Sequence, residues 1–353
     1  MPKTHPTASS LSSHSAGALF DAVVSWDNAL DAYAKTQKGP PRHKPDAILF
    51  SRDWACNLRQ LISEIRAKTY QVSPYHEFMV FDPKQRVVIA PSYRDKIVQH
   101  MINNALREIY EPAFISGSYA CIRGRGNQAA VLALQSMMRK ARRNYGAGAY
   151  LAKADIEKFF YSIDRDILKQ VVRKKITCPD ALWLVDTVIN SAPTAKGLPL
   201  GNLSSQLFAN VYLNEIDQRM KRKYGIRHYL RYADDAFMVL PDKVSARQAL
   251  NDFTHEAQRL ALAVGEKKAY VKPLRAGIDG LGFKVHATHI RLKGCHKIRF
   301  RRRVRCNTPA ANMNSWFGFS RIAKCQSFIR NGLVGSRLKF NGQRFSEVHR
   351  DQI

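Results

Sequence analysis

YLRYADDAFMVL (residues 229–240) has the pattern of a β-hairpin with apolar arms, yet its middle holds two adjacent aspartates, Asp234 and Asp235. An ionised carboxylate among apolar neighbours is costly unless a cation compensates for its charge. The pair therefore indicates a metal site, a contact with a basic partner, or an ordinary solvated turn. The segments around the hairpin in the sequence help to choose among these three interpretations.

The composition indicates a globular protein that binds a polyanion. Its 353 residues are 45% hydrophobic, which is enough for two or three packed lobes. The 57 Lys and Arg residues against 28 Asp and Glu give a formal charge of +29. Nucleic acid is the leading partner for such a charge. An anionic membrane surface is the alternative, but no apolar run is long enough to span a bilayer, so we expect no membrane contact.

The start of the chain and the cysteines carry weaker signals. Residues 1–20 are rich in Ser, Thr and His without a continuous apolar stretch, so we predict a disordered tail rather than a secretory signal. The six cysteines lack C-x-x-C pairs, which fits a reducing compartment and argues against a disulfide framework. Cys295, His296, Cys306 and Cys325 are an alternative zinc set, although their spacing matches no common zinc finger.

Helix-like and strand-like segments alternate along the chain, which predicts an α/β (α+β) fold. The stretch 38–47 contains Pro and Gly and is expected to end the helix on either side of it. A strand hairpin is expected over 76–90, broken at Asp82-Pro83. The expected helices in this part of the chain cover residues 22–36, 54–70 and 97–110.

Two further segments combine with the hairpin to suggest a metal site. Residues 149–164 open as a strand that places Asp155 at its polar end, and residues 205–222 are helix-like after a Gly-containing turn. In two-metal nucleotidyl transfer, one divalent ion activates the attacking hydroxyl and the other neutralises the triphosphate, with the ions about 4 Å apart. Carboxylates from separate strands suit Mg²⁺. We predict that Asp155 and Asp234 bind the ions directly and that Asp235 assists.

These segments resemble the motifs of reverse transcriptases. Tyr232-Ala233-Asp234-Asp235 looks like the Y-x-D-D motif, ADIEKFF resembles the motif of the first catalytic aspartate, and LPLGNLSSQ (198–206) resembles the Gly-containing turn and helix between them. The resemblance extends from about residue 75 through GLGF at 280–283, the position of the primer grip, and more loosely through SWFGF at 315–319. It implies an RNA-directed DNA polymerase with the right-hand fold of fingers, palm and helical thumb.

The resemblance also implies a division of the chain. The four parts are the tail at 1–20, the N-terminal helices and fingers at 21–150, the palm at 151–285, and the thumb with a C-terminal tail at 286–353. Because little sequence follows the thumb, other factors are expected to supply strand cleavage or target entry.

Residue roles follow from the same resemblance. The catalytic carboxylates are Asp155, Asp234 and Asp235, and the binding positions for two Mg²⁺ ions are these three together with Ile156. Phe160 occupies the position of the aromatic gate that disfavours a ribose 2′-hydroxyl. Arg86 occupies the position of the arginine that contacts the triphosphate. Lys268 is expected near the pyrophosphate, with the adjacent Lys267 as an alternative. The implied nucleotide-binding set is Arg86, Phe160, Leu200, Gly201, Gln206 and Lys268.

Two basic stretches are candidates for polyanion binding. RLKGCHKIRFRRRVR (291–305) has no acidic residue, and the apolar Ile298, Phe300 and Val304 predict a packed element whose basic side grips the template–primer backbone. RKARRNYG (139–146) is a second basic patch, for RNA or for a protein partner. The predicted nucleic-acid-binding residues are Arg299, Arg301, Arg302, Arg303 and Arg305.

The turn at 197–206 bears on the subfamily. Group II intron and retron enzymes look like P-Q-G-x-x-x-S-P here, whereas this chain has Leu200 and Gln206, as in reverse transcriptases of diversity-generating retroelements. Leu200 lacks the amide of the glutamine, and losing one polar contact costs about 1–3 kcal/mol of discrimination. The subfamily implies errors opposite template adenines.

The subfamily implies partners and a location as well. The partners are a template-repeat RNA and its cDNA, dNTPs, a small basic accessory protein, and a variable gene that receives the cDNA by mutagenic retrohoming. The location implied is the cytoplasm, for a bacterial or phage-encoded protein. Two alternatives are a group II intron-like or phage-defence reverse transcriptase of ordinary fidelity, and a catalytically idle RNA-binding module. The intact carboxylates count against the idle module.

Overall fold

The computed structural model describes residues 17–81, 85–306, 308–334, 338–341 and 344–347. The predicted tail therefore lies almost wholly outside the described residues, as does the break at Asp82-Pro83. The chain divides into two compact units. The helical unit comprises Met1–Ser116, Ile156–Lys223 and Thr254–Val264, and the sheet unit comprises Gly117–Asp155, Tyr224–Phe253 and Gly265–Ile353.

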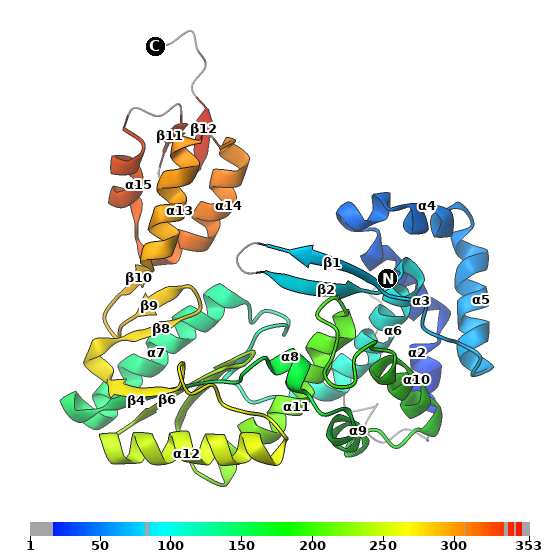
Figure 1. Ribbon diagram of the computed structural model, residues 1–353, viewed down its shortest axis with the longest axis horizontal. Helices are drawn as coiled ribbons and strands as arrows, with labels where there is room; N and C mark the ends of the chain where they lie inside the picture. The colour runs from blue at the N-terminus through cyan, green and yellow to red at the C-terminus, as the bar shows by residue number, and fades with distance from the viewer. Residues whose placement is uncertain (1–16, 82–84, 307, 335–337, 342–343, 348–353) are drawn as a thin grey trace, which may run out of the picture. The chain divides into compact units, whose positions relative to one another are not determined.

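The helical unit consists of helices and one antiparallel hairpin (Figure 1). The hairpin pairs β1 (His76–Val80) with β2 (Arg86–Ala90). The helices are α2 (Ala18–Val23), α3 (Trp26–Thr36), α4 (Pro45–Arg52), α5 (Trp54–Arg66), α6 (Tyr93–Tyr110), α8 (Phe159–Ser162), α9 (Arg165–Arg173), α10 (Pro179–Asn190) and α11 (Leu203–Arg222). Helix α12 (Lys243–Arg259) contributes residues to both units.

The sheet unit is built on a five-stranded sheet with the strand order β3-β5-β6-β4-β7. These strands are β3 (Ser118–Tyr119), β4 (Tyr150–Asp155), β5 (His228–Tyr232), β6 (Asp235–Leu240) and β7 (Tyr270–Pro273). The β5–β6, β6–β4 and β4–β7 pairs are antiparallel, and β3 is parallel to β5. Helix α7 (Asn127–Tyr145) packs on β5 and β6.

Two smaller sheets and three helices complete the sheet unit. One sheet has the order β10-β9-β8, with a two-residue turn between β8 and β9 at Leu281 (φ 56) and Gly282 (φ 86), and the other pairs β11 with β12. The remaining elements are β8 (Ile278–Gly280), β9 (Phe283–Val285), β10 (Ile290–Leu292), α13 (Gly294–Arg305), α14 (Ala310–Ser320), α15 (Gln326–Gly332), β11 (Leu338–Phe340) and β12 (Phe345–Glu347). The 3₁₀ helices among the described residues are η1 (Pro40–His43), η2 (Glu111–Ala113), η3 (Gly146–Gly148), η4 (Leu274–Ala276) and η5 (Arg321–Ala323).

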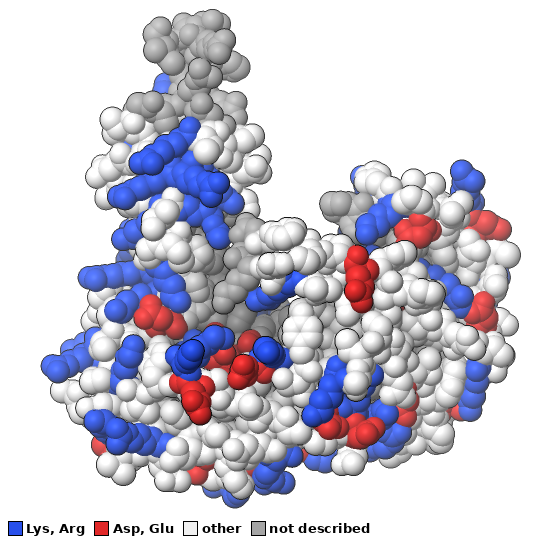
Figure 2. Space-filling view, viewed as in Figure 1, with Lys and Arg blue, Asp and Glu red and all other residues white. Residues whose placement is uncertain are grey.

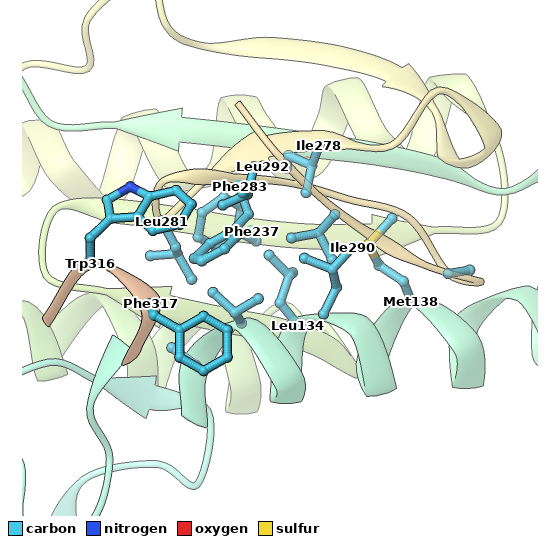
Figure 3. Packing of buried hydrophobic residues seen from close by; sticks show 14 of the residues in the cluster. Leu134, Met138, Phe237, Ile278, Leu281, Phe283, Ile290, Leu292, Trp316 and Phe317 are labelled. Carbon is cyan, nitrogen blue, oxygen red and sulfur yellow. The ribbon is translucent and has the colours of Figure 1, made fainter. Parts of the chain in front are cut away.

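One hydrophobic cluster joins α7, the sheets and the last helices of the sheet unit. Leu134 and Met138 of α7 belong to it together with Phe237 of β6, Phe283 of β9 and Trp316 of α14 (Figure 3). Period-two alternation places Phe237 on the same side of the sheet as Asp235, two residues earlier in β6. The Asp235 carboxylate therefore lies at the start of β6, and the next residues on its side of the sheet, Phe237 and Val239, are packed in the core.

The predicted α/β (α+β) class is confirmed, with instructive differences in single elements. The expected helix over 22–36 is interrupted, because Ser25 accepts a hydrogen bond from the backbone of Asn28 and begins a new helix, α3. The stretch 38–47 was expected to end helices, yet α4 begins at Pro45, the first helical position that proline tolerates. Within the described residues, no helix combines the length and the apolar character that crossing a bilayer requires.

Candidate active site

Three carboxylates gather at one end of the five-stranded sheet. Asp155 is the last residue of β4 and lies directly opposite Asp235, the first residue of β6. Opposed residues of antiparallel strands have Cβ atoms about 5 Å apart. Asp234 lies in the two-residue turn before β6, next to Ala233, which adopts a left-handed conformation (φ 51). The structure thus brings together the three aspartates that the motifs indicated.

A buried arginine holds this turn in place. Arg231 is fully buried, and its guanidinium donates hydrogen bonds to the Ala233 carbonyl and to Ser118 Oγ, each at 2.9 Å. The backbone of Arg231 also donates to the Gly117 carbonyl beside β3 (2.9 Å). Since a left-handed non-glycine residue needs support from its surroundings, Arg231 stabilises the conformation that presents Asp234.

Two lysines neutralise two of the carboxylates. Lys153 Nζ lies 2.7 Å from Asp235 Oδ1, and Lys268 Nζ donates to Asp155 Oδ2 at 2.6 Å. Lys268 is the lysine expected near the pyrophosphate, and both it and the alternative Lys267 are exposed, with Lys268 in contact with Asp155. Lys153 was not predicted, although a lysine two residues before Asp155 in an otherwise apolar strand lies on the same side of the sheet.

The cluster carries more negative charge than its lysines compensate. Burial is the main cause that raises the pKa of Asp234 to about 6, and the charges of Asp235 and Asp155 add to it. Burial also raises the pKa of Asp235, against the opposing effect of Lys153. The hydrogen bond to Asp155 raises the pKa of Lys268.

The donor atoms of this cluster fit a divalent cation. Carboxylate oxygens are the hard ligands that Mg²⁺ prefers, and three carboxylates lie here against two lysine ammonium groups. In the part of the chain that the structure describes, no three acidic, Cys or His side chains converge closely enough to hold a metal ion as they stand. Lysine contacts occupy Asp155 and Asp235 instead, and the alternative zinc set is not assembled either.

Residue Ile156, which was grouped with the metal positions, directly follows Asp155. Its side chain is buried, and its backbone forms an isolated bridge with Val264 in the helical unit. The next backbone amide, of Glu157, donates to Ala263 O at 2.9 Å. The chain is therefore anchored immediately after β4 ends.

In the helical unit, the predicted turn at 198–202 packs directly on β2. A Cβ atom at Gly201 would lie 2.1 Å from the Ile89 carbonyl oxygen, so only glycine permits this backbone approach. The amide of Leu203 donates to Gln99 Oε1 of α6 at 2.8 Å, which fixes the start of α11. Leu200 is half-buried in this turn, and Gln206 is exposed in the first turn of α11.

Arg86 and Phe160 lie on the two segments that adjoin the turn. The amide of Leu198 donates to the Phe160 carbonyl of α8 at 2.7 Å. The Tyr161 hydroxyl donates to the Val87 carbonyl of β2 at 3.4 Å, next to the exposed Arg86. Four of the six predicted nucleotide-binding residues, Arg86, Phe160, Leu200 and Gly201, thus lie on mutually contacting segments of the helical unit, whereas Lys268 belongs to the sheet unit.

Helix α13 carries the predicted basic surface. Phe300 and Val304 are buried one turn apart, as expected, but Ile298 is 68% exposed and the expectation that it packs is wrong. The reason is helical geometry, because position 298 lies on the opposite side of the helix from 300 and 304. Lys and Arg gather over α13 in Figure 2. Of the predicted arginines, Arg301, Arg302 and Arg305 are exposed, while Arg299 and Arg303 are half-buried.

One family model and several known proteins match this chain. The family model described as reverse transcriptase (RNA-dependent DNA polymerase) matches residues 81–285. The chain is 24% identical over 227 residues to the group II intron-encoded protein LtrA of Lactococcus lactis subsp. cremoris, covering 61% of this chain and 35% of that protein. It is 25% identical over 182 residues to protein YkfC of Escherichia coli (strain K12), covering 48% and 47%.

A solved structure of telomerase from Candida albicans, in complex with a TWJ fragment of telomeric RNA, has a TM-score of 0.48 at 11% identity. That alignment covers 77% of this chain and 57% of the telomerase chain. The chain spans about a third of the length of the intron-encoded relative (35%).

Proposed function

Because the chain belongs to the reverse transcriptase family, we propose that it is an RNA-directed DNA polymerase. The observation that carries the proposal is that Asp155, Asp234 and Asp235 lie near one another at one end of the sheet, with Lys153 beside Asp235 and Lys268 beside Asp155. A buried cluster of this kind is destabilising by itself, and a cation-dependent role accounts for its cost.

The proposed ligands of two Mg²⁺ ions are Asp155, Asp234 and Asp235, with Ile156 beside them in the chain. When bound, such ions activate an attacking hydroxyl and neutralise a triphosphate. Lys153 orients Asp235, and Arg231 supports the turn that presents Asp234. If Asp155 bound a cation, its carboxylate would release Lys268, and the ammonium of Lys268 would then be free to bind an anionic phosphate.

The helical unit supplies the proposed contacts to the incoming dNTP. Arg86 is exposed on β2 and offers a guanidinium to the triphosphate. Phe160 is proposed as the gate against a ribose hydroxyl. Gly201 allows the turn to approach β2 closely, which holds the half-buried Leu200 at a defined place.

A finer assignment rests on Leu200 and Gln206. We infer that the protein is the reverse transcriptase of a diversity-generating retroelement, which copies a template-repeat RNA with errors at adenines and works with a small basic accessory protein. A leucine side chain cannot hydrogen-bond to a base pair or to its neighbours, so one constraint on pairing geometry is lost. The alternative is an enzyme of ordinary fidelity, which the similarity to an intron-encoded protein also fits.

The first test is polymerisation by the purified protein with Mg²⁺ and dNTPs. Asp234→Asn together with Asp235→Asn is expected to lower the rate by at least about 10²-fold, since metal ligation is worth several kcal/mol in the transition state. Asp242→Asn is the matched control, because Asp242 is an exposed aspartate after β6. Polymerisation that survives the double substitution would contradict the proposal.

The second test separates the two classes of reverse transcriptase. The cDNA made from the RNA that flanks its gene, with any neighbouring small basic protein, is sequenced deeply and errors are scored by template base. Errors concentrated at adenines support the retroelement assignment, and Leu200→Gln is then expected to reduce them about tenfold. Leu203→Gln, at another half-buried leucine of the same segment, is the control. Uniformly rare errors would place the enzyme in the conventional class.

A further inference from the structure

Three adjoining hollows form a continuous strip at the carboxyl end of α7, within the sheet unit. The middle hollow, which contains Arg139, shares Arg143 with the hollow beside Arg227. It shares Arg142, Ala287 and Thr288 with the hollow beside Arg275. We call this surface the α7 strip. Its lining includes six exposed basic residues, Arg139, Lys140, Arg142, Arg143, Arg227 and Arg275.

The described lining of the α7 strip is basic and contains no acidic residue. Basic residues at the end of a helix interact favourably with the helix dipole, which accounts for a part of the α7 sequence. That effect does not account for Arg227 and Arg275, which come from the segment before β5 and from η4.

The α7 strip is anchored to the neighbouring loop rather than loosely displayed. The Arg139 guanidinium donates to the Ala287 carbonyl and to Gln135 Oε1, each at 3.0 Å. On the other side, Asn144 Nδ2 lies 3.1 Å from His228 Nε2 at the start of β5. These contacts hold the basic end of α7 against two other segments, so the charges are arranged in advance of binding.

The α7 strip lies at the opposite end of the sheet from the carboxylates. It flanks the start of β5 and the η3 turn that leads into β4, whereas Asp155 ends β4 and Tyr232 ends β5. Strands rise about 3.3 Å per residue, so the length of β4 alone separates the two places by roughly 17 Å. A nucleotide at the carboxylates therefore does not touch the strip.

We propose that the α7 strip binds the sugar-phosphate backbone of single-stranded RNA at a place separate from the polymerase site. Guanidinium groups suit phosphate because their donors form a planar fork. The lining has no exposed large apolar or aromatic side chain, which a protein interface needs at its centre. RNA is therefore favoured over an acidic protein as the occupant. The inference does not depend on adenine-directed errors.

The test measures binding of a labelled oligouridylate by the full chain over a series of salt concentrations, without Mg²⁺ or dNTPs. Lys140→Gln with Arg143→Gln is expected to reduce the slope of log affinity against log salt by about 1.4, since each phosphate contact on a single strand contributes about 0.7. The charge-conserving pair Lys140→Arg with Arg143→Lys is expected to restore the slope.

The matched control is Lys243→Gln with Arg247→Gln. This pair removes one Lys and one Arg from exposed positions of α12 in the same unit, so the change in net charge is identical. The control is expected to keep the original slope. The proposal would be overturned if both pairs reduced the slope equally, or if the α7 pair did not reduce it. In the second case, an acidic protein surface would become the better candidate for the partner of the α7 strip. Because no polymerisation is scored, failure of the proposed enzymatic function would leave this result unaffected.

Discussion

Lys153 reaches the carboxylate cluster from the same strand as Asp155, and its ammonium lies 2.7 Å from Asp235 Oδ1. Its side chain is only 11% exposed, and that of Asp235 is 23% exposed. A charge pair in such a place stabilises the fold little as a pair, but removing one partner leaves the other buried and uncompensated. Lys153 is therefore a positioning residue, and its removal would leave the Asp235 carboxylate without its neighbouring positive charge.

Replacing Lys153 tests this charge balance. Lys153→Met is expected to lower the free energy of unfolding by about 2–4 kcal/mol in metal-free buffer, because Asp235 then lacks its cation. Chemical denaturation monitored by circular dichroism measures the change. Adding Mg²⁺ should recover part of the loss, since a divalent cation can replace the ammonium. Lys267→Met, at an exposed lysine, should change stability by less than about 0.5 kcal/mol. Equal effects from the two variants would contradict the role of Lys153.

At the scale of elements, the turn before α11 is held by backbone contact rather than by side chains. Gly201 lies against the Ile89 carbonyl of β2, and the amide of Leu203 is satisfied by Gln99 of α6. Asn202, the residue before α11, makes no side-chain cap and instead donates to the Tyr75 hydroxyl at 3.0 Å. The position of Leu200 thus depends on β2 and α6 as much as on its own segment.

Gly201→Ala is the direct test of that arrangement. The added methyl group would meet backbone atoms that cannot move aside cheaply, so we expect a loss of about 2–3 kcal/mol in stability. Thermal unfolding followed by circular dichroism is a suitable measurement. Gly294→Ala is the matched control, because nothing lies within 4 Å of the added Cβ at the first residue of α13. A neutral Gly201→Ala would show that the turn does not need the close approach.

Helix α6 contributes a pH dependence through His100. Burial, and next the positive charge of Lys35, lower the pKa of His100 to about 4 from its ordinary value near 6.5. Between these values the unfolded chain binds more protons than the folded chain, so the free energy of unfolding rises with pH. This contribution is complete above pH 6.5 and is lost as the pH falls to about 4.

The expected size of this contribution is about 2–3 kcal/mol. Denaturant titrations at a series of pH values should therefore show a slope in this window that His100→Gln reduces. His255→Gln, at an exposed position of α12, should leave the slope unchanged. A pH profile that His100→Gln does not alter would show that His100 is not a source of acid sensitivity.

At the scale of the whole molecule, the charge of +29 is distributed over separate basic surfaces. Helix α13 carries one of them and the α7 strip another, and both belong to the sheet unit. The carboxylates of the same unit are locally paired with lysines. The described residues therefore form at least two positive surfaces, whereas Asp155 and Asp235 are each paired with a lysine.

This distribution predicts strong salt dependence for template–primer binding. If the five arginines of α13 each displace a counterion, log affinity should fall against log salt with a slope of about −4 to −5. Fluorescence anisotropy with a labelled RNA–DNA duplex measures the slope. Arg301→Gln with Arg302→Gln should make it shallower by about 2, whereas Lys243→Gln with Arg247→Gln should not change it. A slope near zero would show that α13 does not grip the backbone.

The sequence predicted those features that depend on local spacing. The helix over 97–110 was evident from its apolar periodicity, although α6 begins earlier, at Tyr93, where Ser92 accepts a hydrogen bond from the Asp95 amide. The three aspartates were evident because motif order and strand alternation place them without reference to the rest of the chain. The local pattern did not predict helix α4, because prolines and a glycine in 38–47 are typical of a break between helices, whereas Pro45 occupies the first position of α4.

By itself, the sequence determined the class of fold, the family and the identity of the carboxylates, because each depends on residues a few positions apart or on motif order. Only the tertiary structure decided which cations meet those carboxylates, and it placed Lys268 on Asp155 across 113 residues of chain. It also decided that Arg231 supports the Asp234 turn, and that Arg275 and Arg227 join the end of α7. The physical reason is that these contacts arise only when strands and helices distant in sequence pack together, and no local pattern records which of several lysines or arginines will be brought into reach.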